Sequence, residues 1–118
     1  MITKPALWRE CQHSANRLAK IKRNLLSIEE EDLKASAKAH RGIIAKAIDD
    51  LQDIADKLRN GMTLEVALQR IGEIRGFCKA AKNYSVRLKQ SKDHQNGLRK
   101  GADIVLNELR DLTIRARY

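Results

Sequence analysis

Residues 33–58, with the sequence LKASAKAHRGIIAKAIDDLQDIADKL, place mainly apolar side chains at two interleaved sets of positions. Within each set the spacing is seven residues: Leu33, His40, Ala47 and Ile54 in the first, and Ala37, Ile44, Leu51 and Leu58 in the second. Such a repeat predicts an α-helix with one apolar seam. Ile43, Ile48 and Ala55 widen the seam, which favours burial inside a bundle over a two-stranded coiled coil. We therefore expect a long helix over residues 28–59.

The segment before this helix predicts another one. Apolar residues recur at steps of three or four over residues 5–26, after a Thr3 cap and with Pro5 in the first turn. Ser27 and Glu30 then form a capping-box pattern that starts the second helix. Because neither Gly nor Pro separates the two helical patterns, the sequence leaves two alternatives open: separate helices, or one bent rod.

On the other side, Asn60-Gly61 predicts the end of the long helix, and Thr63 can cap a further helix over residues 64–90. A connection this short makes the two helices antiparallel neighbours. Gly72 and Gly76 within the second of them suggest a close backbone approach or a local kink. The helical spacing of apolar residues is absent over residues 91–97, which we interpret as a loop. It is present again over residues 98–117, where we expect another helix. We therefore predict an all-α, antiparallel three- or four-helix bundle, dominated by the hairpin of residues 28–59 and 64–90.

The composition agrees with a single helical domain over residues 1–118. One Pro and six Gly are too few to supply the turns of a many-stranded sheet. No apolar run reaches the ~18–20 residues of a membrane span, and the first residues lack the features of a signal peptide. Two cysteines are too few for a disulfide framework. We expect a cytoplasmic protein without membrane contact.

Residues that support catalysis or metal binding do not occur in a recognisable pattern. The candidate ligands Cys11, His13, His40, Cys78 and His94 lack the paired spacing of a zinc site. The aspartates between residues 49 and 56 are flanked by Lys46 and Lys57 and suit a solvated helix face with intrahelical ion pairs. Phosphate-binding loops and nucleophile motifs are missing as well. The sequence therefore predicts no enzyme activity, no catalytic residue, no metal and no cofactor.

The net charge of +9 is distributed unevenly and gives the clearest functional signal. Six basic residues and no acidic one lie between residues 75 and 92: Arg75, Lys79, Lys82, Arg87, Lys89 and Lys92. A second basic row follows the first predicted helix and contains Arg9, Arg17, Lys20 and Arg23, together with His13. Rows of cations at helical spacing can neutralise successive phosphates of a nucleic acid. An ordinary solvated helix face carries similar charge.

These rows lead to two hypotheses. The first is a small, non-catalytic protein that binds DNA or RNA, or a nucleoprotein complex, through the two basic rows. Since only four aromatic residues are present, duplex or structured nucleic acid is preferred over unpaired strands. The alternative is a protein-interaction module, such as an inhibitor, an adaptor or a complex subunit, which docks its basic face on an acidic partner surface. The acidic excess of residues 27–61 also suggests a homodimer.

Overall fold

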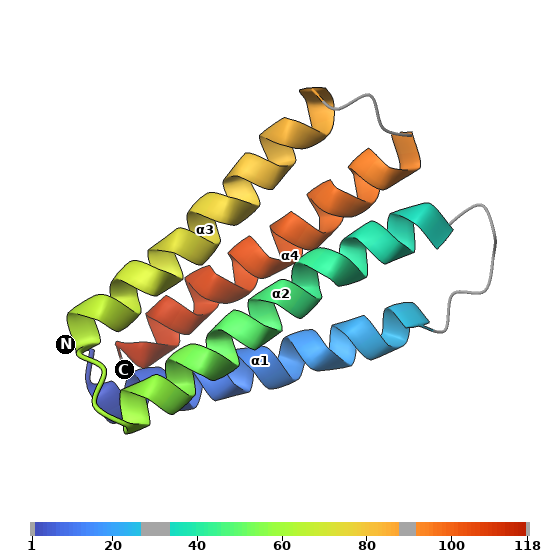
Figure 1. Cartoon of the computed structure of the whole chain (residues 1–118). Helices are drawn as coiled ribbons and strands as arrows, with labels where there is room; N and C mark the ends of the chain where they lie inside the picture. The colour runs from blue at the N-terminus through green and yellow to red at the C-terminus, as the bar shows by residue number, and fades with distance from the viewer. Residues whose placement is uncertain (1, 27–33, 88–91, 118) are drawn as a thin grey trace.

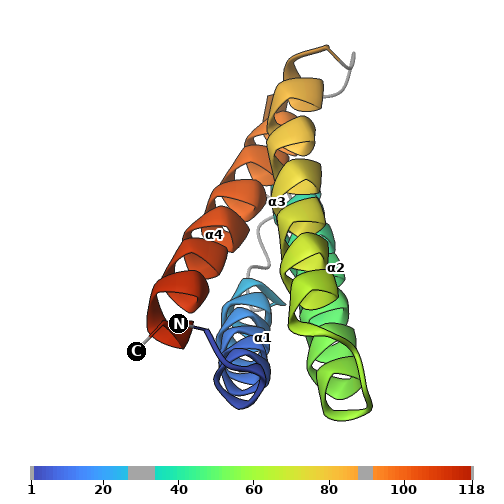
Figure 2. The same ribbon diagram turned by 90° about the vertical axis from the view of Figure 1, so that its left-hand side faces the viewer.

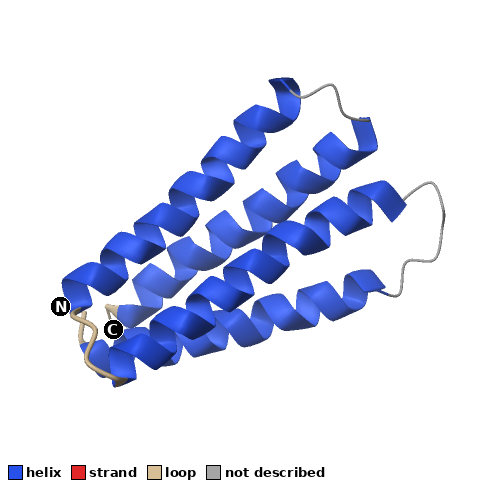
Figure 3. Cartoon of the chain, viewed as in Figure 1, coloured by secondary structure: helices blue, strands red, loops and turns tan. Residues whose placement is uncertain are grey.

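The computed structural model describes residues 2–26, 34–87 and 92–117, and these residues form four helices and no strand (Figures 1 and 3). The helices are α1 (Lys4–Leu26), α2 (Lys34–Arg59), α3 (Leu64–Arg87) and α4 (Lys92–Ala116). They form a bundle with extents of 44 × 29 × 23 Å. The prediction of an all-α helical bundle is therefore confirmed.

The way in which the helices pack differs from the order of the chain. α2 makes its most extensive contacts with α1 and α4, whereas α3 packs mainly on α4, which lies between α3 and α2 (Figure 1). α2 and α3, which are joined by a short turn, share far fewer contacts. The hairpin of α2 and α3 is thus present, but the core is organised around the pair of α2 and α4.

All four helices contribute to one hydrophobic core. α1 contributes Leu7, Cys11, Ala15 and Leu18, and α2 contributes the apolar positions of its seam from Ile43 to Leu58. From α3 come Ala67, Ile71, Ile74 and Cys78, and from α4 come Ala102, Val105, Leu109, Leu112 and Ala116. The seven-residue sets predicted for α2 supply most of the buried positions on that helix, because they follow the face that turns toward α1 and α4.

The relation between the first two helices is now clear. α1 and α2 lie side by side in opposite directions, so the alternative of one bent rod is excluded (Figure 1). Residues 27–33 lie outside the described part of the chain. The predicted cap at Ser27 and Glu30, and the predicted start of the helix at residue 28, therefore stay predictions.

The predicted loop over residues 91–97 is wrong in its larger part. α4 begins at Lys92 rather than at residue 98. Gly97 and Gly101, which weaken a helix when solvated, are both buried on α4. Packing against the bundle therefore overrides the turn-forming tendency of Asn96-Gly97. At the other end, α3 is described as far as Arg87, and residues 88–91 lie outside the described part.

The turn between α2 and α3 forms as predicted. Gly61 has a φ of +112°, and the Met62 N–H donates to the Lys57 carbonyl oxygen at 2.8 Å, which satisfies the last turn of α2. Thr63 accepts a hydrogen bond at its Oγ from the Val66 N–H at 3.2 Å and so caps α3. These contacts fix the direction in which α3 leaves the turn.

Gly72 and Gly76 are not explained by packing within the chain. Both are exposed on α3, and a Cβ atom built on either of them would meet nothing within 4 Å in the described structure. α3 runs without interruption through both positions. The predicted close approach of another segment of this chain is therefore wrong for the described residues.

Candidate functional site

A groove between α3 and α4 is lined by basic side chains from both sides. It has a volume of about 470 Å³ and is lined from α3 by Arg75 and Lys79. The lining residues from α4 are Leu106, Asn107, Arg110, Thr113, Ile114 and Arg117. Its two walls come from antiparallel helices that diverge toward the carboxyl end of α4 (Figure 2).

The register of the two walls follows from an ion pair beside the groove. Lys82 Nζ contacts Asp103 Oδ1, which joins α3 to α4. Because the helices are antiparallel and have the same rise per residue, Arg75 lies level with Arg110, seven residues away from the ion pair on each helix. The groove thus carries cations on both walls.

The charge in the groove is of one sign. Four guanidinium or ammonium groups line it, and no Asp or Glu of the described residues does so. Arg110 Nε lies 3.8 Å from Asp111 Oδ1, but both side chains are largely exposed, so solvent screens this pair. An anion in the groove therefore meets positive charge that local carboxylates do not neutralise.

The lining of the groove is partly apolar. Ile114 is 47% exposed, which makes it one of the few large apolar side chains that the described surface leaves open. Leu106, also on α4, is half-buried and packs against the core. A ligand of this groove therefore contacts apolar carbon as well as cations.

The structure divides the predicted row of residues 75–92. Arg75 and Lys79 line the groove. Lys82 lies next to it and is engaged with Asp103. The side chains of Arg87, Lys89 and Lys92 lie outside the described part, so their place in the site stays a prediction.

The predicted row on α1 is not part of this groove. Arg17 Nε lies 3.7 Å from Glu108 on α4, and Arg9 donates from Nε to the Pro5 carbonyl oxygen at 3.2 Å. Lys20 and Arg23 are exposed on α1. Since α1 packs on α2 and α4 and hardly touches α3, this row lies apart from Arg75 and Lys79.

A polar cluster that the sequence did not predict joins α1 to α4. Ser14 is fully buried and donates from its hydroxyl to Glu108 Oε1 at 2.8 Å. Arg115 donates to Glu10 at 2.7 Å, to Glu108 at 3.0 Å and to Ser14 at 3.2 Å. Burial acts to lower the pKa of Arg115, but the hydrogen bonds with Glu10 and Glu108 outweigh it and raise that pKa. The cluster holds α1 on α4.

No local pattern could have found this cluster, because Ser14 and Arg115 are 101 residues apart in the sequence. Arg110 and Arg117 in the groove were missed for a related reason. Arg110 directly precedes Asp111, Arg117 follows the last residue of α4, and the predicted helix over residues 98–117 mixes basic with acidic side chains, so no basic row stood out. The fold turns the two arginines toward α3, and the spacing of seven between them was the available signal.

Two aspartates of α2, Asp50 and Asp53, form ion pairs. Asp53 Oδ2 lies 2.7 Å from Arg70 Nη1 and 3.1 Å from Lys57 Nζ. The hydrogen bond from Arg70, followed by the one from Lys57, lowers the pKa of Asp53. Among the described residues, no group of three or more His, Cys, Asp or Glu side chains is arranged to hold a metal ion.

Cys11 and Cys78 are buried free thiols. Burial, and to a lesser extent the charge of Glu10, raises the pKa of Cys11 to about 12. Burial also raises the pKa of Cys78 to about 11, against the opposing charge of Lys46. Both side chains are therefore neutral at pH 7 and behave as small apolar groups of the core.

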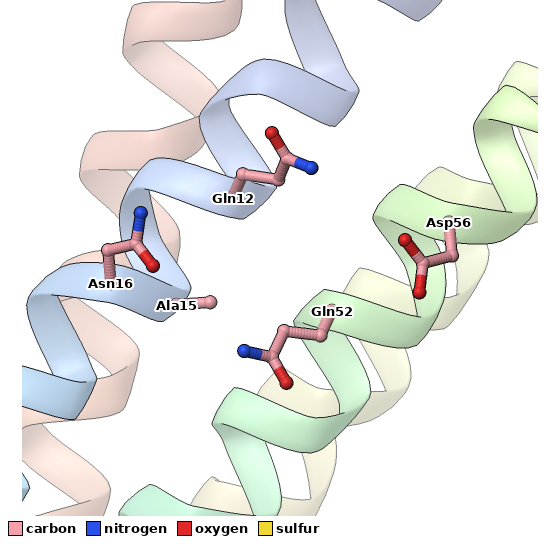
Figure 4. A pocket seen from close by; sticks show the side chains of 5 residues that line it. All are labelled: Gln12, Ala15, Asn16, Gln52 and Asp56. Carbon is pink, nitrogen blue, oxygen red and sulfur yellow. The ribbon is translucent and has the colours of Figure 1, made fainter.

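A second cleft, of about 420 Å³, lies between α1 and α2 (Figure 4). It is lined by Gln12, Ala15 and Asn16 of α1 and by Gln52 and Asp56 of α2. Its polar groups are carboxamides and one carboxylate, without a cation among the lining residues. This chemistry disfavours a phosphate group, so the cleft does not extend the basic site.

Comparison of the chain with protein-family models, with curated proteins and with solved structures found no match. In the described part of the chain, no helix is long and apolar enough to cross a membrane.

Proposed function

We propose that this protein is a small, non-catalytic protein that binds nucleic acid through the groove between α3 and α4. One observation supports the proposal: four cations line the same groove, and no described carboxylate does. They are Arg75 and Lys79 on one side and Arg110 and Arg117 on the other. Cations on two facing walls can contact successive phosphates of one backbone and release the counterions bound there. The net charge of +9 adds long-range attraction for any polyanion.

Such contacts carry little sequence information, because they are made to phosphates rather than to base edges. The protein is then expected to bind many sequences and to act as an accessory component of a nucleoprotein complex. The buried, neutral thiols Cys11 and Cys78 fit a reducing compartment, which favours the cytoplasm as its location.

The proposal is tested by titrating labelled oligonucleotides with the protein at two salt concentrations. The double variant Lys79→Glu/Arg110→Glu should lose at least tenfold in affinity and show a weaker salt dependence. Lys20→Glu/Lys100→Glu is the matched control, since it also reverses two charges and both lysines are exposed outside the groove. If the double variant and the control lose the same affinity, the nucleic acid does not bind in this groove. No binding at low salt would refute the proposal.

A second candidate function is a protein-interaction module with an acidic partner, including a second copy of this chain. The exposed Ile114 beside Arg110 and Arg117 favours it, because an acidic helix with apolar anchors would contact both kinds of group. Ile114→Cys offers a selective attachment point for a photo-crosslinker, since the natural cysteines are buried. Light scattering on the same sample distinguishes a monomer from a dimer.

A further inference from the structure

We propose that the groove between α3 and α4 holds one unpaired strand of nucleic acid rather than a duplex. This inference rests on the proposed function and specifies its ligand. It reverses the preference that the low aromatic content suggests, and it follows from the apolar side chains that line the groove together with its cations.

The cations of the groove differ in exposure. Arg75 is half-buried, whereas Lys79, Arg110 and Arg117 are exposed. Leu106 and Ile114 line the same groove. A ligand that fills the groove and reaches Arg75 therefore contacts apolar carbon as well as the exposed cations.

The apolar part of this lining favours a single strand over a duplex. A duplex presents phosphates and sugars on its outer surface, and an exposed isoleucine gains little from facing charged oxygen atoms. An unpaired strand also presents its bases, whose faces can lie on Ile114 and Leu106 while the phosphates turn toward the two basic walls. Ile114 provides this contact without an aromatic ring. An aliphatic side chain can lie against any of the bases, so we expect binding to depend little on the nucleotide sequence.

The length of the site follows from the register of the helices. Lys79 lies level with Leu106, and Arg117 is eleven residues further along α4. At 1.5 Å per residue the cations therefore span roughly 16 Å. An oligonucleotide of about a dozen nucleotides is ample to fill such a site.

The test compares two probes by fluorescence anisotropy in the same low-salt buffer: an unstructured oligothymidine of about a dozen nucleotides, and a DNA duplex of the same length and label. We expect the oligothymidine to bind at least tenfold more tightly. With four phosphates neutralised, its log affinity should fall with log salt at a slope of about −3. Arg110→Glu should weaken binding and reduce that slope by at least about 0.7, the value for one lost contact.

Ile114→Ser tests the contribution of the apolar contact to affinity without changing the charge of the groove. It should lower the affinity for oligothymidine several-fold, leave the salt slope unchanged and have little effect on the duplex. Lys100→Glu serves as the charge control. Duplex binding as tight as that of the single strand would overturn this inference and leave the proposed function standing, whereas failure of both probes would overturn both. Equal competition by polyglutamate of matched charge would also overturn the inference, because it would show a general anion site.

Discussion

Arg115 of α4 donates a hydrogen bond from Nε to Glu10 of α1 at 2.7 Å, and thereby joins the last helix to the first. The same guanidinium also donates to Glu108 and to the buried hydroxyl of Ser14. Glu108 is only 12% exposed, so its charge depends on these donors.

Replacing Arg115 should therefore destabilise the bundle. We expect Arg115→Met to lower the free energy of unfolding by about 2 kcal/mol, because Glu10 and Glu108 lose a charged donor while the apolar stem of the side chain is kept. Urea denaturation followed by circular dichroism measures this change. Arg117→Met, on an exposed side chain two residues further along the chain, should change stability by less than about 0.5 kcal/mol. Equal effects of the two substitutions would contradict the role given to Arg115.

The exposed glycines of α3 predict a stabilising substitution. Gly76→Ala should raise the free energy of unfolding by roughly 1 kcal/mol, because alanine favours the helix and its Cβ meets nothing within 4 Å. The same urea experiment measures it. A loss of stability would mean that this face of α3 is covered by something other than the described residues.

Gly61 should respond in the opposite way. Its φ of +112° is rarely adopted by residues with a side chain, although the surrounding space is open. We expect Gly61→Ala to lower the free energy of unfolding by about 1 kcal/mol or more. Comparison with Gly76→Ala keeps the chemical change the same and varies only the backbone conformation. A neutral result would show that the turn relaxes without cost.

The buried thiols predict a loss of stability at high pH. Their folded-state pKa values, about 12 for Cys11 and about 11 for Cys78, lie above the ~8.5 of an exposed thiol. The folded state therefore holds these protons more tightly, so this contribution is fully present below about pH 8.5 and is lost as the pH rises toward the folded values.

Unfolding free energies at pH 7 and about pH 10 test this expectation. The wild type should lose about 1–2 kcal/mol per thiol more than the Cys11→Ala/Cys78→Ala variant, which also serves as the control for titrating lysines and tyrosines. Identical pH dependence of the two proteins would show that the thiols ionise without unfolding.

Local signals in the sequence predicted the presence of the helices and the turn at Gly61, because helix caps and apolar spacing depend on residues that are close in the sequence. They failed at Asn96-Gly97, where burial in the bundle decides the conformation. They also failed to separate Arg17, which lies near Glu108, from Lys79 in the groove. A lysine or arginine is available to a ligand only if the fold brings no carboxylate beside it. The spacing of residues within one helix does not show which carboxylates of other helices lie nearby.

The central pairing of α2 with α4 has a consequence for how the chain folds. All of α3 lies between these two helices in the sequence, so their interface closes a long loop, and the α1–α4 contacts close a longer one. Helical proteins whose contacts are local reach the native state fastest. A four-helix chain with this connectivity is expected to fold more slowly than its helix content suggests, with docking of its last helix as the late event.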